Sequence, residues 1–155
     1  MTYVRRTKST TSKKLSINQK IKANISVTQE ELKSEHELQK VCVAKLRAHN
    51  MIVSCTDTYN AISLMRDVGT KAIYKTHMTL MGSAIGFPDL VIFNKGKATF
   101  VEFKFKKGKK SLEQEEWTKR LTEEGYECLE WRTIEDCTNW ILNNTDLKYF
   151  LGYYK

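Results

Sequence analysis

The feature that most constrains this fold is a pair of short apolar segments separated by a polar turn. The first segment ends at Phe93 and the second begins at Ala98, and Gly96 in the turn tolerates positive φ. This pattern predicts a β-hairpin. If residues 95 and 96 form a two-residue loop, counting outward from the turn places Asp89 opposite Glu102. A three-residue loop with a bulge would shift this pairing by one residue.

The predicted hairpin brings charged side chains together. Glu102 and Lys104 share one face of the second strand, because strand side chains alternate. Opposed side chains have Cβ atoms about 4.5–5.5 Å apart, so Asp89 and Glu102 would repel each other without a compensating cation. Their oxygens suit a hard divalent ion, Mg²⁺ or Mn²⁺. The alternative is a turn aspartate beside a solvated Glu-x-Lys ion pair, worth under about 1 kcal/mol.

The spacing of these residues resembles a known nuclease signature. Pro88-Asp89, twelve intervening residues and Glu102-Phe103-Lys104 are similar to the PD-(D/E)XK motif. The surroundings resemble its VRR-NUC branch, which includes stand-alone phage and viral enzymes and the nuclease domain of a eukaryotic DNA-repair protein. This resemblance covers roughly residues 35–142, and its further matches are Gly86, Phe87, Leu90, Ser111, Gln114, Trp117, Leu121 and Gly125.

The resemblance implies a fold, a reaction and a set of site residues. The fold is an α/β structure, a mixed sheet flanked by helices with a restriction-endonuclease-like αβββαβ core. The reaction is hydrolysis of DNA phosphodiester bonds, with Lys104 orienting a water or neutralising charge. Glu35, four residues before Gln39, matches a glutamate of the family at the periphery of the metal site. Otherwise Glu35 is an ordinary first-turn acid, favoured by the helix dipole. The implied metal ligands are Asp89, Glu102, the backbone carbonyl of Phe103 and Glu35.

Composition excludes several other classes of protein. A chain of 155 residues suits one domain with one core. No apolar run approaches the length needed to span a bilayer, and the N-terminus lacks the apolar core of a signal peptide, so we expect an intracellular protein. The four cysteines show no C-x-x-C spacing and the three histidines do not pair with them, which argues against zinc and against a disulfide framework.

The positive charge is concentrated at the N-terminus. Residues 1–28 contain seven basic residues and no acid, and thus nearly all of the net charge of +8. We expect a basic flexible arm over residues 1–28, part-ordered near residue 20, and a nuclease domain over residues 29–155. Such an arm favours a polyanionic partner, in the first instance branched or duplex DNA. Further DNA contacts are predicted at Lys75, Lys106, Lys107, Lys109 and Lys110.

Local signals define most of the remaining elements. Ser34 and Glu37 fit a capping box, in which the Glu37 carboxylate returns to the N–H of Ser34, for a helix that runs to about Asn50. A strand is expected over residues 51–56. A short helix over residues 60–68 would end at Gly69.

The C-terminal part begins with a second capping box. Ser111 and Gln114 open a helix that ends near Gly125, and Gln114 is either the capping partner or a residue of the active site. A strand over 126–131 and a helix through Leu142 follow. The aromatic tail over 149–154 predicts packing on the body or a homodimer. We expect an endonuclease of the Holliday-junction-resolving type; the alternatives are an exonuclease or nicking nuclease, and a non-catalytic nucleic-acid-binding module.

Overall fold

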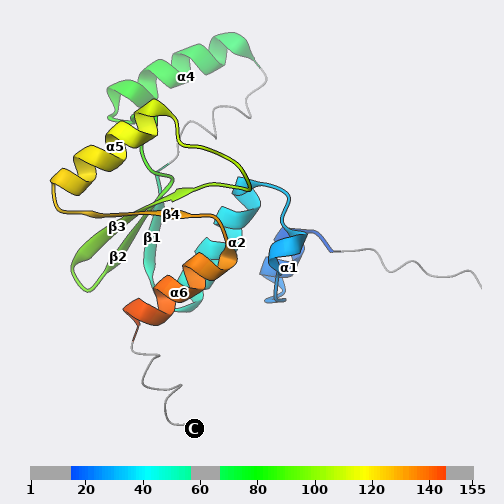
Figure 1. The fold of residues 1–155 in the computed structure, drawn as a ribbon. Coiled ribbons are helices and arrows are strands. Elements are labelled where there is room, and N and C mark those ends of the chain that lie inside the picture. The colour runs from blue at the N-terminus through cyan, green and yellow to red at the C-terminus, as the bar shows by residue number, and fades with distance from the viewer. Residues whose placement is uncertain (1–14, 57–66, 146–155) are drawn as a thin grey trace, which may run out of the picture.

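A four-stranded mixed sheet forms the centre of the protein (Figure 1). The computed structural model describes residues 15–56 and 67–145. The strands lie in the order β1-β2-β3-β4, with antiparallel pairing except between β3 and β4, which are parallel. This α/β architecture confirms the predicted fold class. The bounds of the strands are β1 (Ile52–Cys55), β2 (Leu90–Asn94), β3 (Lys97–Phe103) and β4 (Glu127–Trp131).

The hairpin between β2 and β3 has the predicted register. Lys95 and Gly96 have φ values of 48° and 78°, so both central residues of the turn are left-handed, as a type I′ turn requires. Phe93 pairs with Ala98 and Asn94 with Lys97. The last recorded pair is Leu90 with Val101, and one step further in the same register places Asp89 opposite Glu102.

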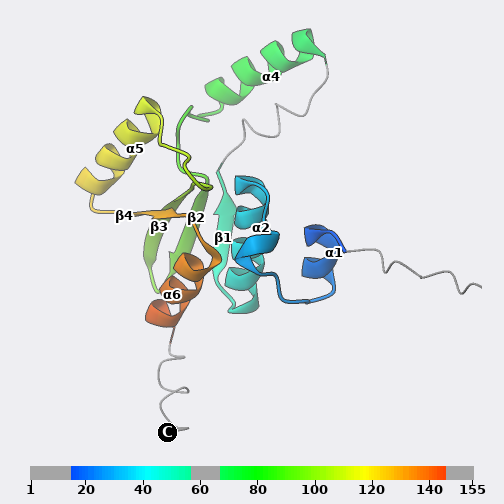
Figure 2. The same ribbon diagram turned by 45° about the vertical axis from the view of Figure 1, so that its right-hand side comes forward.

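Two helices, α2 (Glu35–Ala48) and α6 (Ile134–Asn144), cover one face of the sheet (Figure 2). Their buried side chains recur at helical spacing, and the core residues of β2 and β3 occupy alternate strand positions, so the two patterns meet in a single core. This core includes Leu38, Cys42, Leu46, Leu90, Ile92, Val101, Phe103, Trp131, Cys137 and Ile141.

Helix α5 (Leu112–Glu123) is anchored by aromatic side chains from the strand region. Phe87 makes edge contacts with both Phe100 and Trp117, at ring-centroid distances of 5.6 and 5.1 Å. The helix begins at the predicted capping box, in which Ser111 and Gln114 bond each other's backbone N–H. The start of α5 is thereby fixed to the segment that precedes β2.

The N-terminal segment is ordered over more residues than expected. Order extends from residue 15 onward and is not limited to the vicinity of residue 20: α1 (Ile17–Lys22) packs on the body, and the 3₁₀ turn η1 (Gln29–Glu31) follows it. Ile17 is buried in the core, and Val27 lies against it. The weak apolar pattern of this segment therefore serves packing, a tertiary contact that its period did not reveal. Residues 1–14 lie outside the described residues.

Helix α4 (Val68–Leu80) corrects a second expectation. Gly69 was predicted to end a helix, but it lies in the first turn of α4, whose N-cap is Asp67. Asp67 accepts the N–H of Thr70 and so supplies the start signal of the helix. Residues 60–66 of the predicted helix, and the aromatic tail, lie outside the described residues. Within the described part of the chain, no helix is long and apolar enough to cross a membrane.

Candidate active site

Three charged side chains are buried together at one end of the β2–β3 hairpin. Asp89 immediately precedes β2, Glu102 lies near the end of β3, and Lys104 follows that strand. Their exposed fractions are 8%, 3% and 5%. Burial of a charged group is unfavourable unless it is paired and hydrogen-bonded, so this cluster is a candidate site and not a solvated turn.

Asp89 is held by both neighbouring strands. Its Oδ2 accepts a hydrogen bond of 2.8 Å from the backbone N–H of Phe103, and its backbone carbonyl accepts one of 3.0 Å from Thr56. The hydroxyl of Thr56 also donates to the carbonyl of Pro88. Thr56 was not predicted at the site. Only the β1–β2 pairing, which extends to Cys55 and Leu90, brings it there.

The carboxyl group of Glu102 has a strongly raised pKa and close polar partners. Its Oε1 lies 2.6 Å from Lys104 Nζ and also accepts a hydrogen bond from Gln114 Nε2. Burial raises the pKa of Glu102 to about 7, although the Lys104 ammonium opposes the shift, and the negative charges of Asp89 and Glu35 raise it further. A cation at this position would stabilise the ionised carboxylate.

Gln114 caps α5 and also projects toward Glu102. Its Oε1 accepts the backbone N–H of Ser111 at 3.0 Å, which completes the cap of α5. Its Nε2 donates to Glu102. A side-chain amide carries both an acceptor and a donor, so this one residue caps the N-terminus of α5 and also holds the Glu102 carboxylate.

The segment before Asp89 packs tightly on the start of α5. A Cβ atom on Gly86 would lie 2.6 Å from Glu113 Cβ and 2.9 Å from the backbone nitrogen of Gln114. Trp117 Nε1 donates to the carbonyl of Ile85 at 3.1 Å. Gly86 also has a φ of 77°, which glycine adopts most readily. This close approach sets the distance between Gln114 and the hairpin.

Glu35 lies further from the cluster, at the start of α2. Its charge acts on Glu102, as the raised pKa of Glu102 records. Its neighbour Glu37 has the capping role, with one correction: Ser34 caps the N–H of Glu37, but the Glu37 carboxylate accepts the N–H of Lys33 instead of that of Ser34. Gln39 contacts Cys55 Sγ at 3.6 Å.

Two carboxylates and a backbone carbonyl form a reasonable donor set for a hexacoordinate ion that retains several waters. Among the residues that the structure describes, no group of three or more His, Cys, Asp or Glu side chains is arranged to hold a metal. The two carboxylates and the nearby Phe103 backbone supply oxygen donors of the kind that hard divalent ions such as Mg²⁺ and Mn²⁺ prefer.

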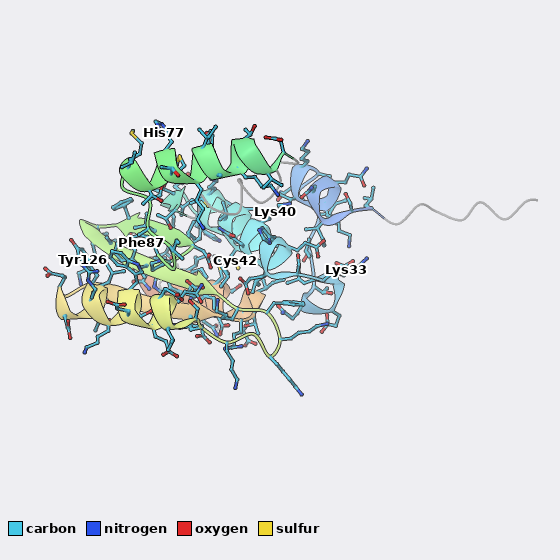
Figure 3. The ribbon with its side chains drawn as sticks, turned by 90° about the horizontal axis from the view of Figure 1, so that it is seen from above. Lys33, Lys40, Cys42, His77, Phe87 and Tyr126 are labelled. Carbon is cyan, nitrogen blue, oxygen red and sulfur yellow. The ribbon has the colours of Figure 1, made fainter. Side chains whose placement is uncertain are left out.

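The predicted basic residues differ in their exposure and in the groups that they contact. Lys75 of α4 lines a cleft of about 280 Å³ together with Thr56, Asp89 and Gln114. Figure 3 shows α4 and α5 along opposite sides of the view from above. Lys106, Lys107 and Lys109 are exposed. Lys110 differs, because its Nζ contacts Thr118 Oγ1 at 3.3 Å and Glu130 Oε2 at 3.8 Å.

Comparison with known proteins identifies the family. The model of the VRR-NUC domain matches residues 23–132, a range that contains the hairpin, the buried cluster and α5. No curated protein and no solved structure matches the chain. The family match covers more than half of the sequence and implies nuclease activity in general; this chain belongs to the VRR-NUC domain family.

Proposed function

We propose that this protein is a divalent-metal-dependent deoxyribonuclease that hydrolyses phosphodiester bonds within branched DNA. The observation that carries the proposal is the buried convergence of Asp89, Glu102 and Lys104 at the end of one hairpin, with Gln114 bonded to Glu102. A structural ion pair alone would not require a second buried carboxylate beside it. That carboxylate raises the energetic cost of the arrangement, which favours a functional role.

Asp89, Glu102 and the backbone carbonyl of Phe103 would hold Mg²⁺ or Mn²⁺. Glu35 would complete the site directly or through a water. The hydrogen bond from the Phe103 N–H fixes the Asp89 carboxylate, and Gln114 fixes that of Glu102. Such an ion, when bound, lowers the pKa of a coordinated water and stabilises charge on the scissile phosphate.

Lys104 has a position suited to assist the reaction. Its ammonium lies 2.6 Å from Glu102 Oε1, beside the proposed metal ligands. There it would orient the attacking water or stabilise the negative charge that develops on the phosphate. A lysine is suited to this task because its charge is a compact ammonium at the end of a flexible stem.

Basic side chains around the cleft would bind the DNA backbone. Lys75 lines the cleft from α4, and the exposed Lys106, Lys107 and Lys109 lie in the segment that follows β3 and the buried Lys104. We include Lys110 as a weaker contact, since Glu130 and Thr118 already engage it. The basic residues before residue 15 would add non-specific attraction to the polyanion.

Substrate geometry supports a dimer. One domain with one site cuts one strand at a time, whereas resolution of a four-way junction needs two matched cuts that a twofold dimer supplies. We therefore propose a homodimer of the Holliday-junction-resolving type that acts inside the cell, on phage, viral or host DNA. An exonuclease or a nicking enzyme of the same fold would instead act as a monomer on ends or on single strands.

Incubation of the protein with plasmid, linear, flapped and four-way-junction DNA tests the proposal, with Mg²⁺, Mn²⁺ or EDTA in parallel. We expect paired cuts in the junction with either metal and none with EDTA. Faster degradation of linear ends by a monomer, as judged by light scattering, would favour the exonuclease. Binding without cleavage under every metal condition would favour the non-catalytic module.

A further inference from the structure

The segment between β3 and α5 has a defined conformation despite its composition. We call residues 106–110, with the sequence Lys-Lys-Gly-Lys-Lys, the lysine loop. Lys106 has a φ of 53°, which is uncommon for a residue with a side chain. Gly108 donates its backbone N–H to the carbonyl of Phe105 at 3.0 Å. A run of like charges would by itself favour an extended and variable loop, so another group must hold this turn in place.

That group is Arg132, which follows β4. Its Nη1 donates to the carbonyl of Lys106 at 2.9 Å and its Nη2 to the carbonyl of Gly108 at 3.0 Å. Its Nε donates to Glu130 Oε1 at 2.6 Å, which balances the guanidinium charge. The parallel pairing of Phe103 with Trp131 explains this placement, because it brings the residue after β4 beside the loop that leaves β3.

The lysine loop also lies beside the proposed active site. A Cβ atom placed on Gly108 would lie 3.6 Å from Lys104 Cδ, so the Gly108 backbone lies close to the stem of the buried lysine. The backbone N–H of Lys104 in turn donates to the carbonyl of Trp131 at 3.0 Å. Arg132 is therefore separated from Lys104 by a single loop residue.

We propose that Arg132 is a positioning residue for DNA binding. By holding two loop carbonyls inward, it fixes the turn from which Lys106, Lys107 and Lys109 project, so that these lysines meet consecutive phosphates without first losing the freedom of a mobile loop. This proposal rests on the proposed action on DNA. A lysine could not replace Arg132, since an ammonium lacks the planar fork that donates to two carbonyls and a carboxylate at once.

Charge-conserving variants isolate this role. Arg132→Lys keeps the net charge and removes the fork, and Arg47→Lys, at an exposed position in the last turn of α2, is the matched control. Binding to a labelled four-way junction is measured in EDTA, where no cleavage occurs, between about 50 and 200 mM salt. Circular dichroism fixes a temperature at which every variant is folded. The same pair is then compared in a background that carries Lys106→Ala, Lys107→Ala and Lys109→Ala.

We expect Arg132→Lys to weaken binding by about tenfold and to flatten the salt dependence, whereas Arg47→Lys changes neither. In the triple-alanine background Arg132→Lys should cause almost no further loss, because the lysines through which it acts are gone. Equal losses in both backgrounds, or no loss in either, would overturn the proposal. Failure of the wild-type protein to cleave any DNA would count against the proposed nuclease function instead, and it leaves this binding measurement unaffected.

Discussion

Gly86→Ala is the substitution whose consequence follows most directly from the structure. The new methyl group would meet Glu113 Cβ at 2.6 Å and two backbone atoms of residues 113 and 114 at 2.8 and 2.9 Å. Backbone atoms at the start of a capped helix have little freedom to move. The residue must also hold a φ of 77°. The substitution therefore has two separate costs, one conformational and one steric.

Gly96→Ala is the control that distinguishes the conformational cost from the steric cost. Gly96 has a φ of 78°, and a Cβ atom there would have nothing within 4 Å. Gly96→Ala should thus carry only the left-handed conformational cost, about 1–2 kcal/mol. Gly86→Ala should add an overpacking cost of about 1–3 kcal/mol. We also expect it to displace the start of α5 and weaken the bond between Gln114 and Glu102.

Urea unfolding followed by tryptophan fluorescence measures both variants, since Trp117 lies at the contact itself. The expected result is a midpoint lower for Gly86→Ala than for Gly96→Ala, with cleavage lost mainly in the former. If the two variants have equal unfolding free energies and equal cleavage rates, then α5 does not pack on the segment before Asp89 as described here.

Three further predictions test the site. Ser111→Ala should lower the unfolding free energy by about 1 kcal/mol and spare cleavage, whereas Gln114→Ala should reduce both, as urea titrations and rate assays would reveal. In the metal-free protein the folded state retains a proton on Glu102 that the unfolded chain releases, so the unfolding free energy should fall as pH rises from about 4.5 to about 7. If Glu102→Gln shows the same pH dependence of the unfolding free energy as wild type, this prediction is wrong. Removal of residues 1–14, with their five basic residues, should flatten the salt dependence of DNA binding while leaving the cleavage rate at saturation intact.

The hairpin could be predicted from sequence because local signals determined its geometry. A two-residue turn with glycine at its second position, between apolar segments of strand length, leaves few alternative registers. Strand alternation places Lys104 on the same face as Glu102, but the burial of both side chains was not evident from sequence. Gln114 was harder to assign, since sequence offered a cap or a position at the active site as alternatives, and in the structure one amide both caps α5 and bonds Glu102.

The parts that sequence did not reveal depend on contacts between distant segments. Thr56 reaches Asp89 only through the pairing of β1 with β2. Arg132 reaches the lysine loop only because β3 and β4 are parallel. The order of residues 15–28 arises from burial of Ile17 against the core. For α4, Gly69 suggests the end of a helix, whereas Asp67, two residues earlier, is the N-cap at which α4 begins.

The central claim is that Asp89 and Glu102 hold a catalytic metal while Lys104 assists the chemistry. The most direct test compares wild type, Asp89→Asn and Lys104→Ala for cleavage of a four-way junction in Mg²⁺ and for binding to it in EDTA. We predict that both variants lose cleavage while binding and fold are largely retained, because neither side chain lies on the exposed basic surface. Substantial metal-dependent cleavage by Asp89→Asn would contradict the metal assignment.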